Sequence, residues 1–346
     1  MLKRNTVFIV GAGASAEFNL PVGEELARRI KRSLTLCEPN RGWLCTDDYI
    51  EAAIRSRSKA QGPDRTQLLN GARRISEGLP LHLSIDNFME NHKEEEEIQI
   101  CGKIAIVRHI AAAEAKSTLA SRNALREQPE LAKWLRLLFQ LMQQGIARSN
   151  AHNFFRNSTF IVFNYDRCVE YFFEQALQMA YSLPTGTARE IVNSARFMHP
   201  YGTIAPLPWQ PTASTFSHEF GVENIDCNTA ALNLLTYSEY ISDETKETEF
   251  YSVYREADVF VFLGFSFLDQ NVDLVLPQKF SAEYARSNRQ NRKTAIGTAF
   301  NIHEYNATLI AGDIQSRLSG IHTAVVNLDR TQTCEELIRN YGRAFA

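Results

Sequence analysis

A short apolar run near the start of the chain leads directly into a glycine-rich turn, and this pairing is compatible with few folds. Residues Thr6–Val10 read TVFIV, which is typical of a parallel strand buried on both faces. The next residues fit the relaxed pattern G-x-G-x-x-A, whose small side chains let the backbone approach a pyrophosphate at the start of a helix. The pattern predicts a nucleotide-binding turn; the alternative is a tight turn that only packs a helix on a sheet. The turn comprises Gly11, Ala12, Gly13, Ala14 and Ser15.

Five further apolar runs have the length of strands, and each is followed by a loop or a helical stretch. Such alternation implies right-handed crossovers, so we predict an α/β fold with a doubly wound, six-stranded, parallel, Rossmann-like sheet. Residues 45–157 contain no predicted strand, because apolar residues recur there at helical spacing. We expect a large helical insertion within one domain that spans residues 1–346. The predicted strands are Thr6–Val10, Thr159–Phe163, Arg196–His199, Val259–Leu263, Thr294–Ala299 and Thr323–Leu328.

The composition argues against several classes of function. The 37 basic and 40 acidic residues give a net charge of −3, whereas nucleic-acid and membrane-surface binders need a concentrated positive field. We therefore expect no direct nucleic-acid binding and no membrane association. The chain shows no signal peptide and no long apolar span, so the expected location is the cytoplasm. The six cysteines form no Cys-x-x-Cys pair, so we predict neither a zinc site nor any other metal site, and no disulfide framework.

Polar residues and a second glycine motif stand at the ends of three other predicted strands. Asn164 and Asp166 follow the second strand, His199 ends the third, and Gly264 and Ser266 follow the fourth. Functional residues of doubly wound sheets gather at strand ends, so this placement favours a polar site. The structural alternatives are helix caps for Asp166, Asn164 or Ser266, and a merely structural histidine. An imidazole titrates near neutral pH and is suited to act as a base toward a ribose hydroxyl or water.

The segment after the first helix disfavours a dehydrogenase function. Dehydrogenases place an acidic residue about 20 positions beyond the glycine turn, after a second strand, to hold the adenosine ribose. Here a predicted helix is followed by the sequence Cys-Glu-Pro-Asn-Arg-Gly at positions 37–42. Hydride transfer is therefore not the expected chemistry.

Taken in this order, the motifs resemble those of the sirtuin-like (silent information regulator two) superfamily, especially its divergent bacterial branch found in anti-phage defence proteins. The glycine turn matches the opening motif, Asn164-Tyr-Asp166 the Asn-x-Asp motif, His199 the catalytic histidine and Gly264-x-Ser266 the late loop. The resemblance spans about residues 6–330. It implies that NAD is the substrate, held by the turn and the late loop, with its nicotinamide end near Asn164, Asp166 and His199. It further implies that Asn164 positions the ribose and attacking water, that His199 acts as base or ribose contact, and that Asp166 supports them electrostatically.

Two departures from the protein deacetylases of this superfamily indicate a different acceptor. Those enzymes carry a four-cysteine zinc module, which this chain lacks. They also continue the opening motif with Gly-Ile-Pro-Asp-Phe-Arg, of which this chain keeps only Pro21 as a further NAD-binding candidate. The resemblance with these departures implies an NAD glycohydrolase that uses water and releases nicotinamide and ADP-ribose. Its expected role is that of the NAD-depleting effector of a bacterial anti-phage defence system.

Two other functions remain open, and control is expected to come from outside the chain. One is a protein deacylase or ADP-ribosyltransferase that uses the same pocket, and the other is a module that senses NAD or an ADP-ribose derivative without turnover. Because such a toxic activity needs restraint, we expect a homo-oligomer or a regulatory partner such as the HerA-like ATPases that accompany some relatives. We assign no site role to Asp86, Asp269 or Asp273, although each carboxylate could approach a pocket in a doubly wound fold.

Overall fold

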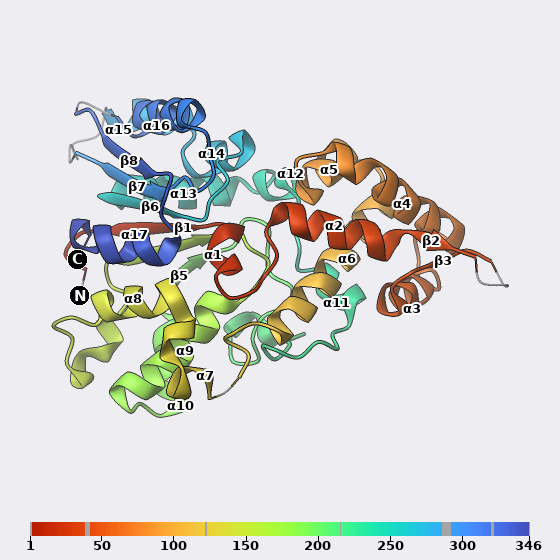
Figure 1. Ribbon diagram of the computed structural model, residues 1–346, viewed down its shortest axis with the longest axis horizontal. Helices are drawn as coiled ribbons and strands as arrows, with labels where there is room; N and C mark the ends of the chain where they lie inside the picture. Colours follow the sequence, from red (N-terminus) through yellow and green to blue (C-terminus); the bar gives the residue numbers. More distant parts are fainter. Residues whose placement is uncertain are drawn as a thin grey trace.

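The computed structural model describes residues 2–38, 42–121, 123–214, 216–285, 292–319 and 322–345. Within them, the main sheet has six strands: β1 Thr6–Val10, β4 Ser158–Val162, β5 Arg196–Met198, β6 Val259–Leu263, β7 Thr294–Thr298 and β8 Val325–Asp329. All neighbouring strands are parallel, in the order β5-β4-β1-β6-β7-β8 (Figure 1). Numbered along the chain, this is the order 3-2-1-4-5-6 of Rossmann folds, so the predicted fold class is confirmed.

Side chains of the central strands alternate between two buried clusters on opposite faces of the sheet. In β1, Val7 and Ile9 belong to one cluster, whose side we call the first face, whereas Phe8 and Val10 belong to the other, the second face. Helices cover both faces, and this double burial explains why the central strands read as continuous apolar runs.

The helices are described in two groups, before and after β4. The first group comprises α1 Ala12–Ala16, α2 Gly23–Leu34, α3 Asp48–Arg57, α4 Arg65–Gly78, α5 Ile85–Asn91, α6 Glu96–Ala115, α7 Ala124–Glu127 and α8 Lys133–Met142. The second comprises α9 Cys168–Tyr181, α10 Thr185–Asn193, α11 Cys227–Ala231, α12 Tyr237–Ile241, α13 Glu244–Glu256, α14 Asp269–Val275, α15 Gln278–Ala285, α16 Glu304–Leu318 and α17 Cys334–Tyr341. Short 3-10 turns occupy Leu79–Leu81, Pro129–Ala132, Arg148–Asn153, Pro211–Ser214 and Gly342–Ala344.

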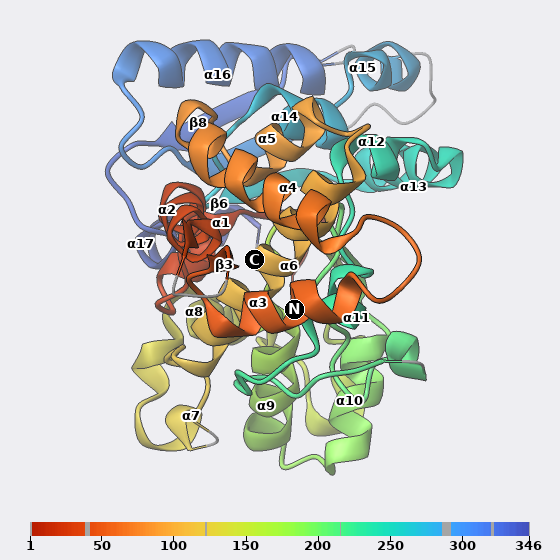
Figure 2. The same ribbon diagram turned by 90° about the vertical axis from the view of Figure 1, so that its right-hand side faces the viewer.

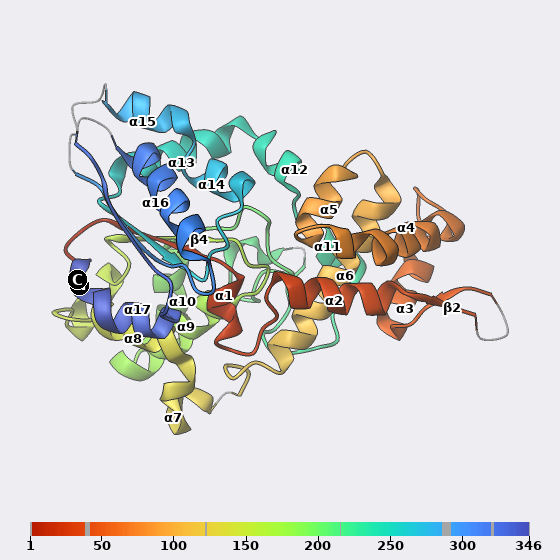
Figure 3. The same cartoon turned by 45° about the horizontal axis from the view of Figure 1, so that its top comes forward.

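Part of the helical segment between the first turn and β4 projects beyond one end of the sheet, whereas α8 packs against α9 and α17 (Figure 1). Figures 1 and 3 show α3, α4 and α5 beyond the end of β1 at which α1 begins. Helix α6 lies within this group and packs against α2, α3, α4, α5 and α11 (Figure 2). Because α6 is surrounded on several sides, its residues are apolar around most of the helix, for example Ile98, Ile104 and Val107.

One small element at the edge of this segment was not predicted from the sequence. A hairpin pairs β2 Leu36–Cys37 with β3 Leu44–Cys45 in antiparallel register. Strands of two residues are too short to show an alternating pattern. Part of the segment that disfavoured a dehydrogenase lies outside the described residues: Pro39, Asn40 and Arg41.

The described residues also bear on membranes and metals. Across the described ranges, no helix combines the length and the apolar character needed to cross a membrane. Over the same ranges, no group of three or more His, Cys, Asp or Glu residues is arranged to hold a metal ion. The two ends of the chain lie close together (Figure 1), and the Arg4 guanidinium donates to the Ala344 carbonyl at 3.3 Å.

Candidate active site

A cavity of ≈ 550 Å³ lies where β1, β4 and β6 end. The strand order reverses between β1 and β6, and ligand crevices of doubly wound folds form at such a switch point. Most of the predicted site residues line this cavity; Ala14 and His199 do not. Those that line it are Gly11, Ala12, Gly13, Ser15, Pro21, Asn164, Asp166, Gly264 and Ser266.

The first turn and the loop after β6 are in direct backbone contact. The amide of Gly13 donates to the Gly264 carbonyl at 3.0 Å, and the amide of Gly11 donates to the Leu263 carbonyl at 2.9 Å. A Cβ at Gly13 would stand 2.8 Å from the Gly264 Cα, and one at Gly11 would stand 2.6 Å from the Gly264 oxygen. Gly11 and Gly13 are therefore required for close packing, which was the structural alternative to nucleotide binding. Both also line the cavity. Ala14 serves the packing alone: it is fully buried, and its carbonyl accepts from the Trp134 indole at 3.0 Å.

The start of α2 faces the same cavity with free space before it. Val22, the N-cap residue, makes no side-chain capping bond, and a Cβ added to Gly23 would meet no atom within 4 Å. Both residues line the cavity together with Pro21. Amide hydrogens in the first turn of a helix and the helix dipole favour an anion at this position. The cavity therefore has room for a phosphate group next to the amides that begin α2.

Asn164 is held rigidly against the first turn. Its Nδ2 donates to the Gly11 carbonyl at 3.0 Å and to the Ser15 hydroxyl at 2.7 Å, and only 7% of the residue is exposed. These two bonds occupy both amide hydrogens, so Oδ1 is the atom of this side chain that can accept a hydrogen bond from a ligand. The first turn thus orients Asn164 as well as lining the cavity.

Asp166 is buried and engaged by the protein itself. Its Oδ1 accepts from the Cys168 amide at 3.1 Å, at the first residue of α9, whereas the N-cap of that helix is Arg167. The Ser15 hydroxyl also bonds to the carboxyl group. Burial, followed by the nearby charge of Glu114, raises the pKa of Asp166 above its ordinary value.

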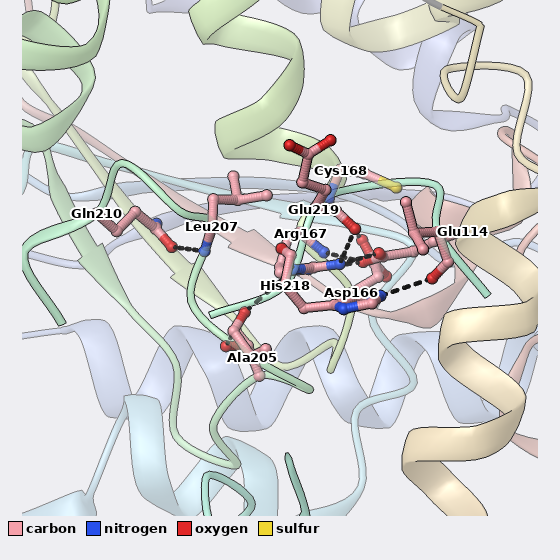
Figure 4. Close-up of polar contacts among 11 residues, drawn as sticks. Glu114, Asp166, Arg167, Cys168, Ala205, Leu207, Gln210, His218 and Glu219 are labelled. Carbon is pink, nitrogen blue, oxygen red and sulfur yellow. Dashed lines mark hydrogen bonds and ion pairs between the residues drawn. The ribbon is translucent and has the colours of Figure 1, made fainter. Parts of the chain in front are cut away.

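A buried ion pair fixes the loop that carries Asn164 and Asp166. The Arg167 guanidinium pairs with the Glu114 carboxylate of α6, and each side chain is 1% exposed. Arg167 also donates to the carbonyls of Ala205 and His218, at 3.4 and 2.5 Å (Figure 4). The pair therefore ties the helical segment, the loop after β4 and the loop after β5 to one another.

The late loop supplies an exposed hydroxyl. Ser266 is exposed and lines the cavity, whereas α14 begins at Asp269 with Leu268 as its N-cap. The capping alternative proposed for Ser266 is therefore wrong. Gly264 has a φ of +56°, a conformation that favours glycine, and its amide donates to the Thr298 hydroxyl at 2.9 Å.

His199 does not line the cavity that Asn164 and Asp166 share, although its ring contacts the backbone of Asn164. Within β5, Met198 points to the first face and Phe197 to the second, and His199 continues the side of Phe197. There it lines a separate cavity of ≈ 360 Å³, and its Nε2 bonds to the Glu170 carboxylate of α9 at 2.6 Å. Burial opposes the charged ring, but the charge of Glu170 prevails and raises the pKa of His199. The structure therefore does not bring His199 into the cavity with Asn164, and its catalytic role stays a prediction.

Two tyrosines and one aspartate that carried no site prediction line the main cavity. Tyr201, two positions after His199, packs on the first face and donates its hydroxyl to Asn271 at 2.5 Å. The Tyr165 hydroxyl donates to the Asp86 carboxylate. No local signal favoured Tyr201 over His199, because β5 ends at Met198 and Tyr201 lies in the turn that follows. No local signal marks Asp86, because it comes from a helix remote in sequence.

Comparison with known protein families gave one result. Residues 158–309 match the family model described as a SIR2-like domain. The matched range contains Asn164, Asp166, His199 and the late loop, and it begins after the first turn. No curated protein and no solved structure matched the chain. SIR2-like domains are NAD-dependent enzymes. Residues 158–309 therefore form a SIR2-like domain of the sirtuin-like superfamily.

Proposed function

We propose that this protein is an NAD hydrolase that breaks the bond between nicotinamide and ribose and releases nicotinamide and ADP-ribose. One observation carries the proposal: the glycine turn after β1, Asn164 after β4 and the Gly264–Ser266 loop after β6 meet in one cavity at the switch point of the sheet. This arrangement joins a cradle for a pyrophosphate to a rigid polar group.

Each part of the cavity has a role in this reaction. The first turn, the start of α2 and the late loop hold the pyrophosphate and the adenosine part. The Oδ1 atom of Asn164 orients a ribose hydroxyl or the attacking water, and buried Asp166 supports it electrostatically. The transition state is electron-poor at the anomeric carbon, so a site that orients the ribose and the water lowers the barrier. The resemblance implies that His199 acts as base or ribose contact. It lines a separate cavity and bonds to Glu170, so it has the least structural support of the set.

Water is the proposed acceptor because the chain departs from the deacetylase pattern. The four-cysteine zinc module has no counterpart in the sequence, and after the first turn the Phe-Arg pair of the deacetylases is replaced by Gly23 and Glu24. An added Cβ at Gly23 would meet no atom within 4 Å, so the space near this position is open. These differences support hydrolysis over acyl-lysine transfer.

The proposal extends to a role as NAD-depleting effector in bacterial anti-phage defence, in the cytoplasm, under control by a homo-oligomer or a partner such as a HerA-like ATPase. The resemblance of the motifs supports the role. The rim of the cavity supports control by a covering subunit, because Val22, Leu83 and Phe300 line it with exposed fractions of 41%, 75% and 55%. Exposed apolar side chains grouped at one opening are typical of surfaces that bind other molecules.

The first test is nicotinamide release from NAD by the purified protein, alone and with proteins encoded by neighbouring genes. Asn164→Ala should abolish release, and His199→Ala tests the predicted histidine role. Asn70→Ala, an exposed position on α4 outside the cavity, is the matched control and should keep full activity. Free ADP-ribose without modified protein distinguishes hydrolysis from ADP-ribosyl transfer or deacylation. NAD binding without release under every condition would replace the hydrolase with a sensing module.

A further inference from the structure

Three carboxylates line the main cavity, and they differ in what they can do there. Asp166 is 3% exposed and accepts hydrogen bonds from the Cys168 amide and the Ser15 hydroxyl. The Glu24 side chain is 87% exposed and faces Arg28 at 4.0 Å. Asp86 is only partly exposed and receives a hydrogen bond from Tyr165. Among the described residues of the cavity, Asp86 is therefore the carboxylate that is both held in place and open to a ligand.

The position of Asp86 is fixed by its own helix and by the loop after β4. Helix α5 is capped by Ser84, whose hydroxyl accepts from the Asn87 amide at 3.1 Å. Ile85 and Phe88 on either side of Asp86 are 1% and 2% exposed, so the helix cannot rotate without unpacking. Tyr165 is 6% exposed and directly follows Asn164 in the chain. One hydrogen bond thus joins Asp86 to the residue next to Asn164.

We propose that Asp86 is the general base of the hydrolysis, a catalytic residue contributed by the helical segment; this inference rests on the proposed function. The bond between the anomeric carbon and the nicotinamide nitrogen breaks, and its electron pair leaves with neutral nicotinamide. The water oxygen forms the new bond to the anomeric carbon, and Asp86 takes the proton that the water loses. The proton then passes to solvent, so one NAD and one water give nicotinamide, ADP-ribose and one proton.

The surroundings of Asp86 suit this task. Burial raises the pKa of its carboxyl group, and the hydrogen bond from Tyr165 limits that rise. A base with a pKa moved toward neutrality accepts a proton more readily than an ordinary aspartate. The negative charge also stabilises the positive charge that develops on the ribose. Tyr165 acts through Asp86 and is a positioning residue.

The test compares Asp86→Asn with wild type under saturating NAD. Asparagine keeps the size of the side chain and an oxygen for the Tyr165 hydroxyl but cannot take the proton. We expect kcat to fall about 100- to 10,000-fold, while NAD affinity and the melting temperature stay at the wild-type values. Asp48→Asn is the matched control, an exposed aspartate in the first turn of α3 that should leave kcat unchanged.

A second variant tests the same proposal through its pH profile. Tyr165→Phe removes the hydrogen bond that lowers the pKa of Asp86, so the acid limb of kcat should move to higher pH. A purely structural role for Tyr165 would lower activity without moving that limb. Tyr305→Phe, at an exposed tyrosine of α16, controls for the loss of a hydroxyl.

The outcomes separate this inference from the proposed function. Wild-type release of nicotinamide with equal release by Asp86→Asn would overturn the role of Asp86 and leave the hydrolase standing. Loss of NAD binding or of folding in Asp86→Asn, with an unmoved acid limb in Tyr165→Phe, would also overturn it. NAD binding without release by wild type would instead remove the hydrolase itself.

Discussion

Replacing Glu114 by glutamine should strongly destabilise the protein, because it leaves the buried Arg167 guanidinium without a counter-charge. Each side chain is 1% exposed, so water cannot solvate the unpaired charge. Breaking a buried pair by removing one partner costs about 3–5 kcal/mol. Glutamine keeps the size of the side chain and one acceptor oxygen, and Arg167 keeps its bonds to the carbonyls of Ala205 and His218. We therefore expect a loss of about 3 kcal/mol.

The measurement is urea unfolding of Glu114→Gln beside wild type, reported as the free energy of unfolding. The matched control is Glu77→Gln, which breaks the Glu77–Arg73 pair within α4, where the side chains are 61% and 48% exposed. That exposed pair should contribute about 0.2–1 kcal/mol. A loss from Glu114→Gln as small as that of the control would refute the reasoning. It would mean that the carbonyl partners alone stabilise Arg167.

Two further predictions concern the glycine turn and a buried histidine. Gly13→Ala should cost about 1–3 kcal/mol and weaken NAD binding, because its Cβ would stand 2.8 Å from the Gly264 Cα. Gly312→Ala, in α16 outside the cavity, should do neither, because its Cβ would meet no atom within 4 Å; calorimetry of NAD binding with melting curves checks both. Burial lowers the pKa of His109 from 6.5 to about 4. Between these pH values the unfolded chain binds more protons than the folded protein, so the free energy of unfolding falls as the pH falls. His109→Gln should remove about 2 kcal/mol of the difference in unfolding free energy between pH 7 and pH 5, and an unchanged difference would contradict the burial of the ring.

The strand segments and the first turn could be predicted because their signals are local. The central strands are buried on both faces, so each reads as a continuous apolar run, and the predicted strand ends differ from the observed ones by no more than two residues. Asn164, Asp166 and Ser266 could be chosen as candidates because polar residues at strand ends gather at one edge of a parallel sheet. The division of the chain into one domain stays a prediction.

Which of these residues share a cavity was decided only by the tertiary structure. His199 stands at a strand end like the others, but it bonds to Glu170 and lines a separate cavity. Tyr201, in the turn after β5, lines the main cavity instead. Asp86 joins the cavity because α5 packs next to Tyr165, a contact between positions 79 residues apart. Local pattern determines which residues form strands and turns, whereas the face of a side chain and its distant neighbours depend on how the elements pack together.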